Sequence, residues 1–152
     1  MVTSSGKTIT ERDLSGLAAH LRLVITRTAR RLRQQAGTGL GPSQISALAS
    51  IERHGPLTPS ELAEIERIQR PSATRIVARL EEAELVERVV DPTDRRSFTV
   101  GINAAGRALM NKHRTRKNAY LAKRLRGLDE ADLATLDRAA EILEDLLEGE
   151  RR

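Results

Sequence analysis

Four arginines lie between residues 67 and 80, a stretch without an acidic residue. Its apolar residues recur at helical spacing, which predicts a helix with one buried and one solvent-facing side. On the outer side, the planar fork of Arg75 can bind the O6 and N7 atoms of guanine, and Thr74 can contact a base edge or a thymine methyl group. Arg79, one turn later, is better placed for a phosphate. This pattern favours a helix that reads double-stranded DNA. Its expected contact residues are Arg70, Pro71, Ser72, Thr74, Arg75 and Arg79.

A second basic element is expected in the loop over residues 91–96. Apolar residues alternate on both sides of this loop, which predicts two strands joined as a β-hairpin with Arg95 and Arg96 at its tip. Arginine at a hairpin tip suits a narrow minor groove, where the potential is most negative. Asp94 can hold one arginine by a short ion pair. Either element alone is also compatible with a solvated basic surface, but a hairpin directly after an arginine-bearing helix favours DNA contact.

The residues before the arginine-bearing helix indicate how it is positioned. Thr58, Pro59 and Glu61 combine an N-cap, a proline at the first helical position and the glutamate of a capping box, which predicts a short helix. Two short helices joined by a tight connection form a helix-turn-helix. Ser43 is expected to cap the helix before them. We therefore expect residues 43–103 to form a winged helix-turn-helix DNA-binding region with a two-stranded β-wing.

Long amphipathic helices are expected at both ends of this mainly α-helical chain. One lies within residues 10–36, and two more lie within 104–148, the first of them capped by Asn103. The apolar stripes of the first and last helices are too wide to stay exposed, which predicts a homodimer. Both segments together should form the helical dimerisation region of one intertwined domain. The expected dimerisation residues are Leu14, Leu17, Leu21, Leu133, Leu136, Leu143 and Leu147.

Charge is distributed unevenly along the chain. The net charge of +5 and the pI of about 10.4 point to a polyanionic partner. Residues 128–152 contain nine acids and three bases, a net charge of −6, so residues 1–127 carry +11. This complementarity favours interlocked terminal helices. Residues 104–127 hold eight bases and no acid. These bases are expected near the acidic last helix or in solvent, with phosphate contact as the alternative.

Composition and spacing disfavour several other functions. The absence of cysteine excludes disulfides and thiolate metal sites, and 1% aromatic residues argues against a stacking platform for single strands. No apolar run approaches the roughly 20 residues of a membrane span, and the N-terminus does not resemble a signal peptide, so we expect a cytoplasmic protein without a membrane partner. His20, His54 and His113 lack zinc-type spacing, and His54 is expected to end a helix. No nucleophile motif or phosphate-binding loop occurs. We expect no enzyme activity, metal or cofactor.

From Leu57 to Leu109 the chain resembles the MarR family of bacterial regulators. The resemblance implies an obligate dimer in which the first helix and the last two helices pair across a two-fold axis and carry two winged modules to successive major grooves of a palindromic operator. It also implies repression that is relieved when a small anionic or phenolic compound binds between the dimerisation and DNA-binding parts. Arg96 is implied to enter the minor groove, braced by Asp94. The matching segments are residues 57–63, 70–81, 85–88, 91–96 and 106–109.

Glu84 departs from the family pattern, which usually has glycine before the Leu85-Val86 pair. If this position requires a left-handed backbone, glutamate costs roughly 1 kcal/mol relative to glycine. The fold expectation does not depend on it. A winged helix that binds another protein without touching DNA is the alternative function, but the arginines of the predicted helix and hairpin favour DNA.

Overall fold

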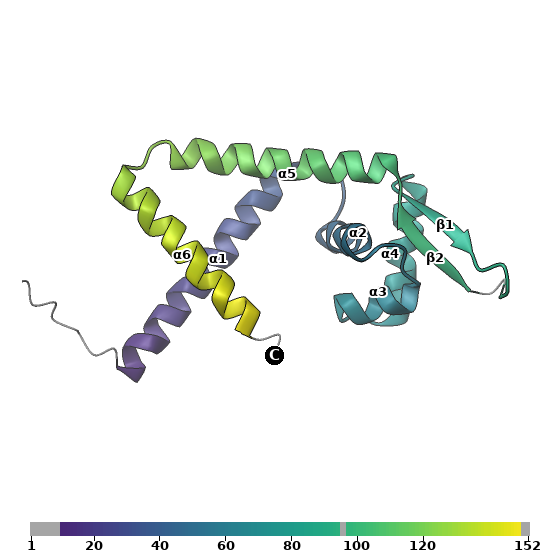
Figure 1. The fold of residues 1–152 in the computed structure, drawn as a ribbon, viewed down its shortest axis with the longest axis horizontal. Helices are drawn as coiled ribbons and strands as arrows, with labels where there is room; N and C mark the ends of the chain where they lie inside the picture. The colour runs from purple at the N-terminus through teal and green to yellow at the C-terminus, as the bar shows by residue number, and fades with distance from the viewer. Residues whose placement is uncertain (1–9, 95–96, 150–152) are drawn as a thin grey trace, which may run out of the picture.

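The computed structural model describes residues 10–94 and 97–149. Over these residues the chain is mainly helical and carries a two-stranded sheet, which confirms the predicted winged helix-turn-helix with helices at both ends (Figure 1). The elements in order are α1 (Glu11–Ala36), α2 (Pro42–His54), α3 (Pro59–Glu66), α4 (Arg70–Glu82), β1 (Val86–Val90), β2 (Phe98–Ile102), α5 (Ala104–Leu125) and α6 (Glu130–Gly149).

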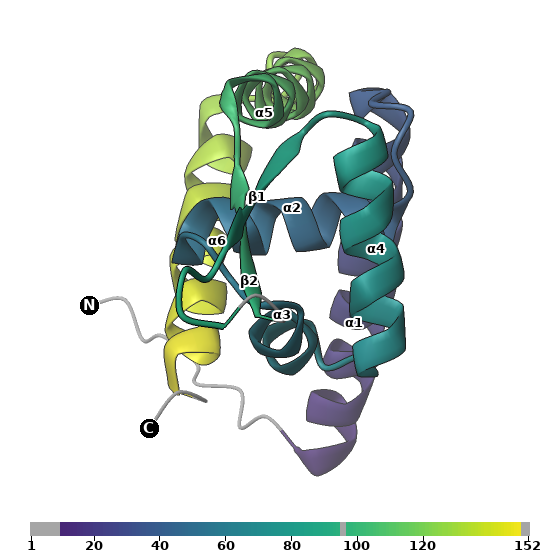
Figure 2. The same cartoon turned by 90° about the vertical axis from the view of Figure 1, so that its right-hand side faces the viewer.

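The hydrophobic core lies in the winged unit, which we define as residues 42–103. Side chains from α2, α3, α4 and β2 meet there and are almost completely buried. The two strands pair antiparallel, with Val86 opposite Ile102 and Val90 opposite Phe98. Leu57, directly before α3, adds a backbone bridge to Val100. Burial of this core holds α4 and the wing in one rigid unit (Figure 2). The largest fully buried side chains are Leu48, Ile51, Leu62, Val77, Leu80 and Val100.

Helix starts agree with the sequence signals in most cases. The predicted capping box of α3 is present, because the Glu61 amide donates to the Thr58 hydroxyl at 3.2 Å and the Thr58 amide donates to the Glu61 carboxylate at 2.8 Å. The prediction that Ser43 caps α2 is wrong. The helix begins at Pro42, two residues before the start that a Ser43 cap implies, and the Gly41 amide donates to the Gln44 side chain at 2.8 Å. Proline has the backbone angle of a first helical turn, so it fixes the start.

Glu84 lies in the left-handed region, with φ of 55°. The condition for the strain cost at this position is therefore met. The carbonyl of Glu84 accepts a hydrogen bond of 2.8 Å from Asn103 Nδ2, and Asn103 Oδ1 accepts from the Gly106 amide at 2.9 Å, so Asn103 caps α5 as predicted. Gly106 is needed there, since a Cβ atom would collide with the carbonyl oxygen of Leu85. The end of α4 and the start of α5 are thereby fixed against each other.

Replacing Glu84 with glycine is expected to raise the free energy of unfolding by about 0.5–1 kcal/mol, because it relieves the left-handed strain at an exposed position. Urea denaturation followed by circular dichroism measures this change. Glu82→Gly is the matched control, since Glu82 has helical geometry in α4 and glycine there should be destabilising. If both substitutions lowered the free energy of unfolding equally, the conclusion that Glu84 is strained would be contradicted.

Helices α1, α5 and α6 form a frame beside the winged unit. In Figure 1, α5 runs from the wing end of the winged unit to the α6 end of the frame. The buried residues of α5 are Gly106, Met110 and His113, all in its first half, where it packs on the winged unit. The second half of α5 leaves that core and packs on α1. Helix α5 is therefore one continuous helix that joins the core of the winged unit to α1 and α6.

Candidate nucleic-acid interface

Helix α4 places its arginines and its apolar residues on opposite sides, as the spacing predicts. Ala73, Val77 and Leu80 are buried in the core. The predicted contact side is open to solvent over its whole length, apart from the half-buried Ser72. The structure therefore brings the predicted helix residues together on one surface, and their contact with DNA stays a prediction. The exposed residues of this surface are Arg70, Pro71, Thr74, Arg75 and Arg79.

The polar groups on α4 are only lightly engaged by the protein itself. The Thr74 hydroxyl donates to the Arg70 carbonyl at 3.0 Å, which leaves the oxygen lone pairs and the methyl group available. Arg75 Nη2 donates to Ser72 Oγ at 3.5 Å, the upper limit of a hydrogen bond. The guanidinium group of Arg75 can therefore turn toward a base without losing a strong internal contact.

The loop that follows β1 in the β-wing is shaped by Asp91. Its carboxylate accepts hydrogen bonds from the amide and the hydroxyl of Thr93, at 2.8 and 2.6 Å, and from the Asp94 amide at 3.3 Å. The Thr93 hydrogen bonds are the main reason that the pKa of Asp91 is lowered. Asp94 is exposed. Arg95 and Arg96 lie outside the described residues, so minor-groove entry by Arg96 and bracing by Asp94 remain predictions.

Arg88 anchors the wing to α4, a role that the sequence analysis did not assign. Its guanidinium carbon lies 3.8 Å from the ring centroid of Phe98, and its Nε and Nη2 atoms donate to the Glu81 carboxylate at 2.9 and 3.0 Å. Arg88 faces Val100 across the strands, so Phe98 is its diagonal neighbour. The strand register could have indicated the stacking, but the sequence could not show that the end of α4 approaches β1.

Comparison with known proteins places the chain in a family. The MarR family model matches residues 40–98. An HTH-type transcriptional regulator of Mycobacterium tuberculosis is 34% identical over 128 residues, which cover 84% of this chain and 90% of that protein. The chain belongs to the MarR family. As a MarR protein it is a DNA-binding transcriptional regulator, which confirms the resemblance found in the sequence.

Two further similarities span different lengths of this MarR chain. The crystal structure of a putative transcriptional regulator from Pseudomonas aeruginosa superposes with a TM-score of 0.81 at 34% identity, and covers 91% of this chain and 97% of that one. The HTH-type transcriptional repressor MdtR of Bacillus subtilis is 30% identical over 95 residues, 62% of this chain and 61% of the repressor. The first similarity extends beyond the winged unit, so the frame helices belong to the shared fold.

A cleft of about 420 Å³ lies between α1, α2 and α5 of the MarR chain, where the frame meets the winged unit. The described residues around it combine cationic and apolar side chains. His113 is only 4% exposed, and burial, followed by repulsion from Lys117 and Arg114, lowers its pKa. The cleft therefore suits a small anion with an apolar body. Its lining is Arg30, Arg33, Gln34, Thr38, Leu40, Pro42, Ile45 and His113.

Large apolar side chains stay exposed on α1 and α6. Ala36 is the buried residue of α1, and no residue in the described helix α6 is buried. An apolar hollow of about 660 Å³ runs between α5 and α6, with Leu121, Leu133 and Leu136 in its lining. Within residues 10–94 and 97–149 of the single chain, no segment buries the leucines of these surfaces. The predicted dimerisation residues lie on them, with Leu14, Leu17, Leu21, Leu133, Leu136 and Leu147 exposed and Leu143 half-buried.

The eight basic residues within 104–127, seven of them in α5, lie mostly in solvent, which was one of the expected positions. Lys117 alone of the eight is half-buried. Arg114 pairs with Glu52 of α2, and Arg116 donates to the carbonyls of Ala36 and Gly37 at the end of α1. Within the described residues, the hydrogen bonds of these two side chains to other helices are therefore with α2 and α1 and not with the acidic α6.

The remaining titratable residues do not form a metal site within residues 10–94 and 97–149, where no group of three or more His, Asp or Glu side chains could hold an ion. His54 ends α2, as predicted. In the same residues, no helix is long and apolar enough to cross a membrane.

Proposed function

We propose that this MarR protein is a cytoplasmic homodimeric repressor that binds an imperfect palindromic operator in double-stranded DNA. The observation that carries the proposal is α4, whose arginines Arg70, Arg75 and Arg79 are exposed while its other side is buried in the core. A helix held in this way can enter the major groove and read base edges. The name of the relative MdtR, a repressor, supports repression as the regulatory effect.

Charge and exposed apolar surface support the dimer. Residues 22–33 of α1 carry five arginines and no acid, whereas α6 carries seven acids and one base, a net charge of −6. Helices of opposite charge with exposed leucine stripes are suited to pack on each other across two copies. A two-fold axis would then present two copies of α4, with half-site centres about 10 bp apart.

An electrophoretic mobility shift with random-sequence duplex DNA tests the proposed function. MarR-type binding should give salt-sensitive retardation, because arginines on α4 displace counterions from phosphates. Arg75→Glu together with Arg79→Glu should abolish the shift while leaving the circular dichroism spectrum unchanged. Retardation that is unaffected by both substitutions would contradict binding through α4, and no retardation at low salt would favour the protein-binding alternative.

Arg96 is proposed as the wing residue that enters the minor groove, on the basis of the family resemblance and the hairpin that carries it. Arg96→Ala should weaken binding most at operators with A·T-rich flanks, where the groove is narrow, and Arg95→Ala should have a smaller effect. Fluorescence anisotropy on operators with A·T-rich and G·C-rich flanks measures the difference. Wild-type affinity of Arg96→Ala on both operators would show that the wing does not read the minor groove.

We further propose that a small anionic or phenolic effector binds in the cleft between α1, α2 and α5 and releases the operator. The cationic side chains can hold the anionic group, and Leu40, Pro42 and Ile45 can cover the apolar body. A ligand at this place touches both the frame and the winged unit, so it can favour one arrangement of the two over the other.

Benzoate is a suitable probe for the cleft. Arg33→Gln should weaken benzoate binding about tenfold through loss of a charge-assisted contact, whereas Arg22→Gln, on the same helix but outside the cleft, should not. Because the pKa of His113 is lowered in the free protein, an adjacent anion should raise this pKa and favour protonation, so affinity should rise as the pH falls through and below about 6.5. Calorimetry measures both effects. Equal affinities of the wild type and Arg33→Gln would exclude the cleft as the benzoate site.

A further inference from the structure

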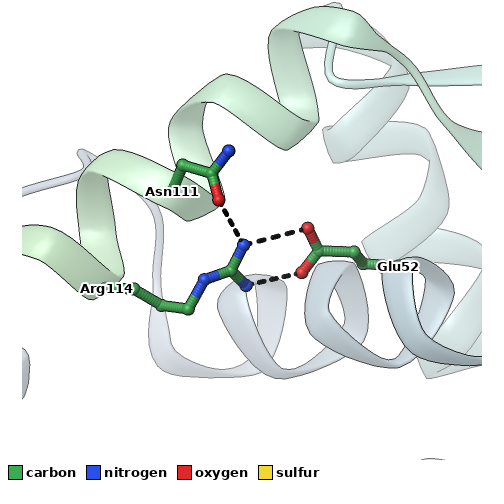
Figure 3. A network of polar contacts seen from close by, with 3 residues as sticks. All are labelled: Glu52, Asn111 and Arg114. Atoms are coloured by element: carbon green, nitrogen blue, oxygen red, sulfur yellow. Dashed lines mark hydrogen bonds and ion pairs between the residues drawn. The ribbon is translucent and has the colours of Figure 1, made fainter.

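Three residues join α5 to α2 at the point where α5 leaves the core. The Arg114 guanidinium donates to both carboxylate oxygens of Glu52, Nη1 to Oε2 at 2.7 Å and Nη2 to Oε1 at 3.2 Å. Nη2 also donates to the Asn111 side-chain oxygen at 2.6 Å (Figure 3). Asn111 lies one turn before Arg114 on the same helix, so it orients the guanidinium toward α2. The planar fork on a carboxylate fixes direction as well as distance.

The position of this network sets it apart from the other ion pairs of the described residues. Arg88–Glu81 lies within the winged unit and Arg138–Glu141 lies within α6, whereas Arg114–Glu52 connects a frame helix to a core helix. His113 is the last buried residue of α5, and Arg114 follows it directly. The contact therefore lies where α5 leaves the winged unit, so a bend in α5 at this point would turn the frame relative to the winged unit.

Arg116 fastens the second connection between the frame and the winged unit. Its Nη1 donates to the carbonyls of Ala36 and Gly37, at 3.0 and 2.9 Å, where α1 ends and the chain turns toward α2. One short segment of α5, residues 111–116, thus holds both the last turn of α2 and the start of the linker that leads to α2. Loosening this segment would allow α5 to bend here, so that the winged unit could turn relative to α1 and α6.

We propose that Glu52, Asn111 and Arg114 form a clamp that sets the direction of the winged unit relative to the dimer frame, and thereby the half-site spacing that the protein accepts. This inference rests on the proposed dimeric DNA-binding function. The pair is half-exposed, with side-chain exposures of 49% for Arg114 and 24% for Glu52. A pair so exposed adds little to the stability of the fold. The proposed effect of the clamp is on the direction of the winged unit, so Glu52, Asn111 and Arg114 are positioning residues.

Spin-label distances between the two protomers test the clamp without knowledge of the operator. The chain contains no cysteine, so Glu64→Cys on the exposed side of α3 places one label in each winged unit. The parent dimer should give one narrow distance peak. Arg114→Glu should lose that peak and give a broad distribution, because the two like charges repel and the clamp opens. The charge swap Glu52→Arg with Arg114→Glu should restore the narrow peak.

Lys112→Glu is the matched control, since Lys112 lies on the same exposed stretch of α5 and has no contact with Glu52. It should keep the narrow peak, and all variants should keep the parent's circular dichroism spectrum. A narrow peak in Arg114→Glu, or a broad one that the charge swap does not narrow, would overturn the clamp. An absent dipolar signal in the parent would instead overturn the proposed dimer, on which the clamp depends.

DNA binding provides the second measurement, with palindromic duplexes obtained by selection and re-synthesised with one base pair added to or removed from the spacer. The wild type should prefer the selected spacing about tenfold, roughly 1.4 kcal/mol. Arg114→Glu should bind the three spacings alike, and the charge swap should recover the preference. A uniform loss of affinity with the preference retained would assign Arg114 to phosphate contact and overturn the clamp.

Discussion

Aspartate at both Leu136 and Leu143 is expected to convert the dimer into a monomer and to abolish specific DNA binding. Both residues lie on the apolar stripe of α6, where Leu136 is 47% exposed and Leu143 half-buried in the single chain. Packing against a second copy would bury two unpaired carboxylates per chain, at a cost of several kcal/mol. A monomer holds one recognition helix, so it also loses the avidity of two linked half-sites, which is worth about 10²- to 10⁴-fold.

Sedimentation velocity and fluorescence anisotropy with the selected operator measure the two losses together. The control is Arg138→Asp, which also lowers the charge by two per chain and lies on the far side of α6 from Leu136 and Leu143. It should remain a dimer and bind the operator. A wild-type protein that sediments as a stable folded monomer would contradict the proposed assembly, as would a leucine double variant that stays dimeric.

The second large effect is expected from Arg75 on α4. Arg75→Ala should lower affinity for the specific operator by about 1–3 kcal/mol and relax the preference at one base position, since a bidentate contact with guanine is lost. Arg79→Ala should instead weaken specific and random sequences alike and reduce the salt slope by about one unit, as expected for a phosphate contact. Both side chains are exposed, so neither substitution should disturb the core.

Anisotropy titrations over a salt series, on the operator and on a scrambled duplex, separate the two roles. The diagnostic quantity is the ratio of specific to random affinity. This ratio should fall for Arg75→Ala and stay constant for Arg79→Ala. If both variants change the two affinities equally, the proposed division between base reading and phosphate contact is wrong.

Local signals in the sequence predicted most of the fold. The two strands of the hairpin follow from period-two alternation around a turn-rich loop, and the structure places them on either side of this loop, at Val86–Val90 and Phe98–Ile102. The capping residues Thr58 and Asn103 mark helix starts because their side chains accept the free amides of a first turn. The buried side of α4 could be predicted because helical spacing alone separates its apolar residues from its arginines. Glu84 is left-handed, which is the condition under which its departure from the family's glycine was expected to cost stability.

Features that depend on the approach of distant segments were not predictable in this way. Arg88 contacts Glu81 only because β1 returns past the end of α4, and Arg114 meets Glu52 across 62 residues. The spacing of apolar residues along the sequence does not predict contacts of this kind between side chains of different elements. The cleft between α1, α2 and α5 depends on the angle between the frame and the winged unit. The family resemblance implied a ligand site between the dimerisation and DNA-binding parts, but it identified no residues of that site.

Selection of binding sites from a random duplex library, with the mass of the resulting complex, tests the central claim most directly. A dimeric MarR repressor that reads DNA with α4 should enrich an imperfect palindrome with half-site centres about 10 bp apart, and two chains should bind one duplex. The account would be contradicted by enrichment of a single asymmetric half-site bound by one chain, or by no enrichment at all.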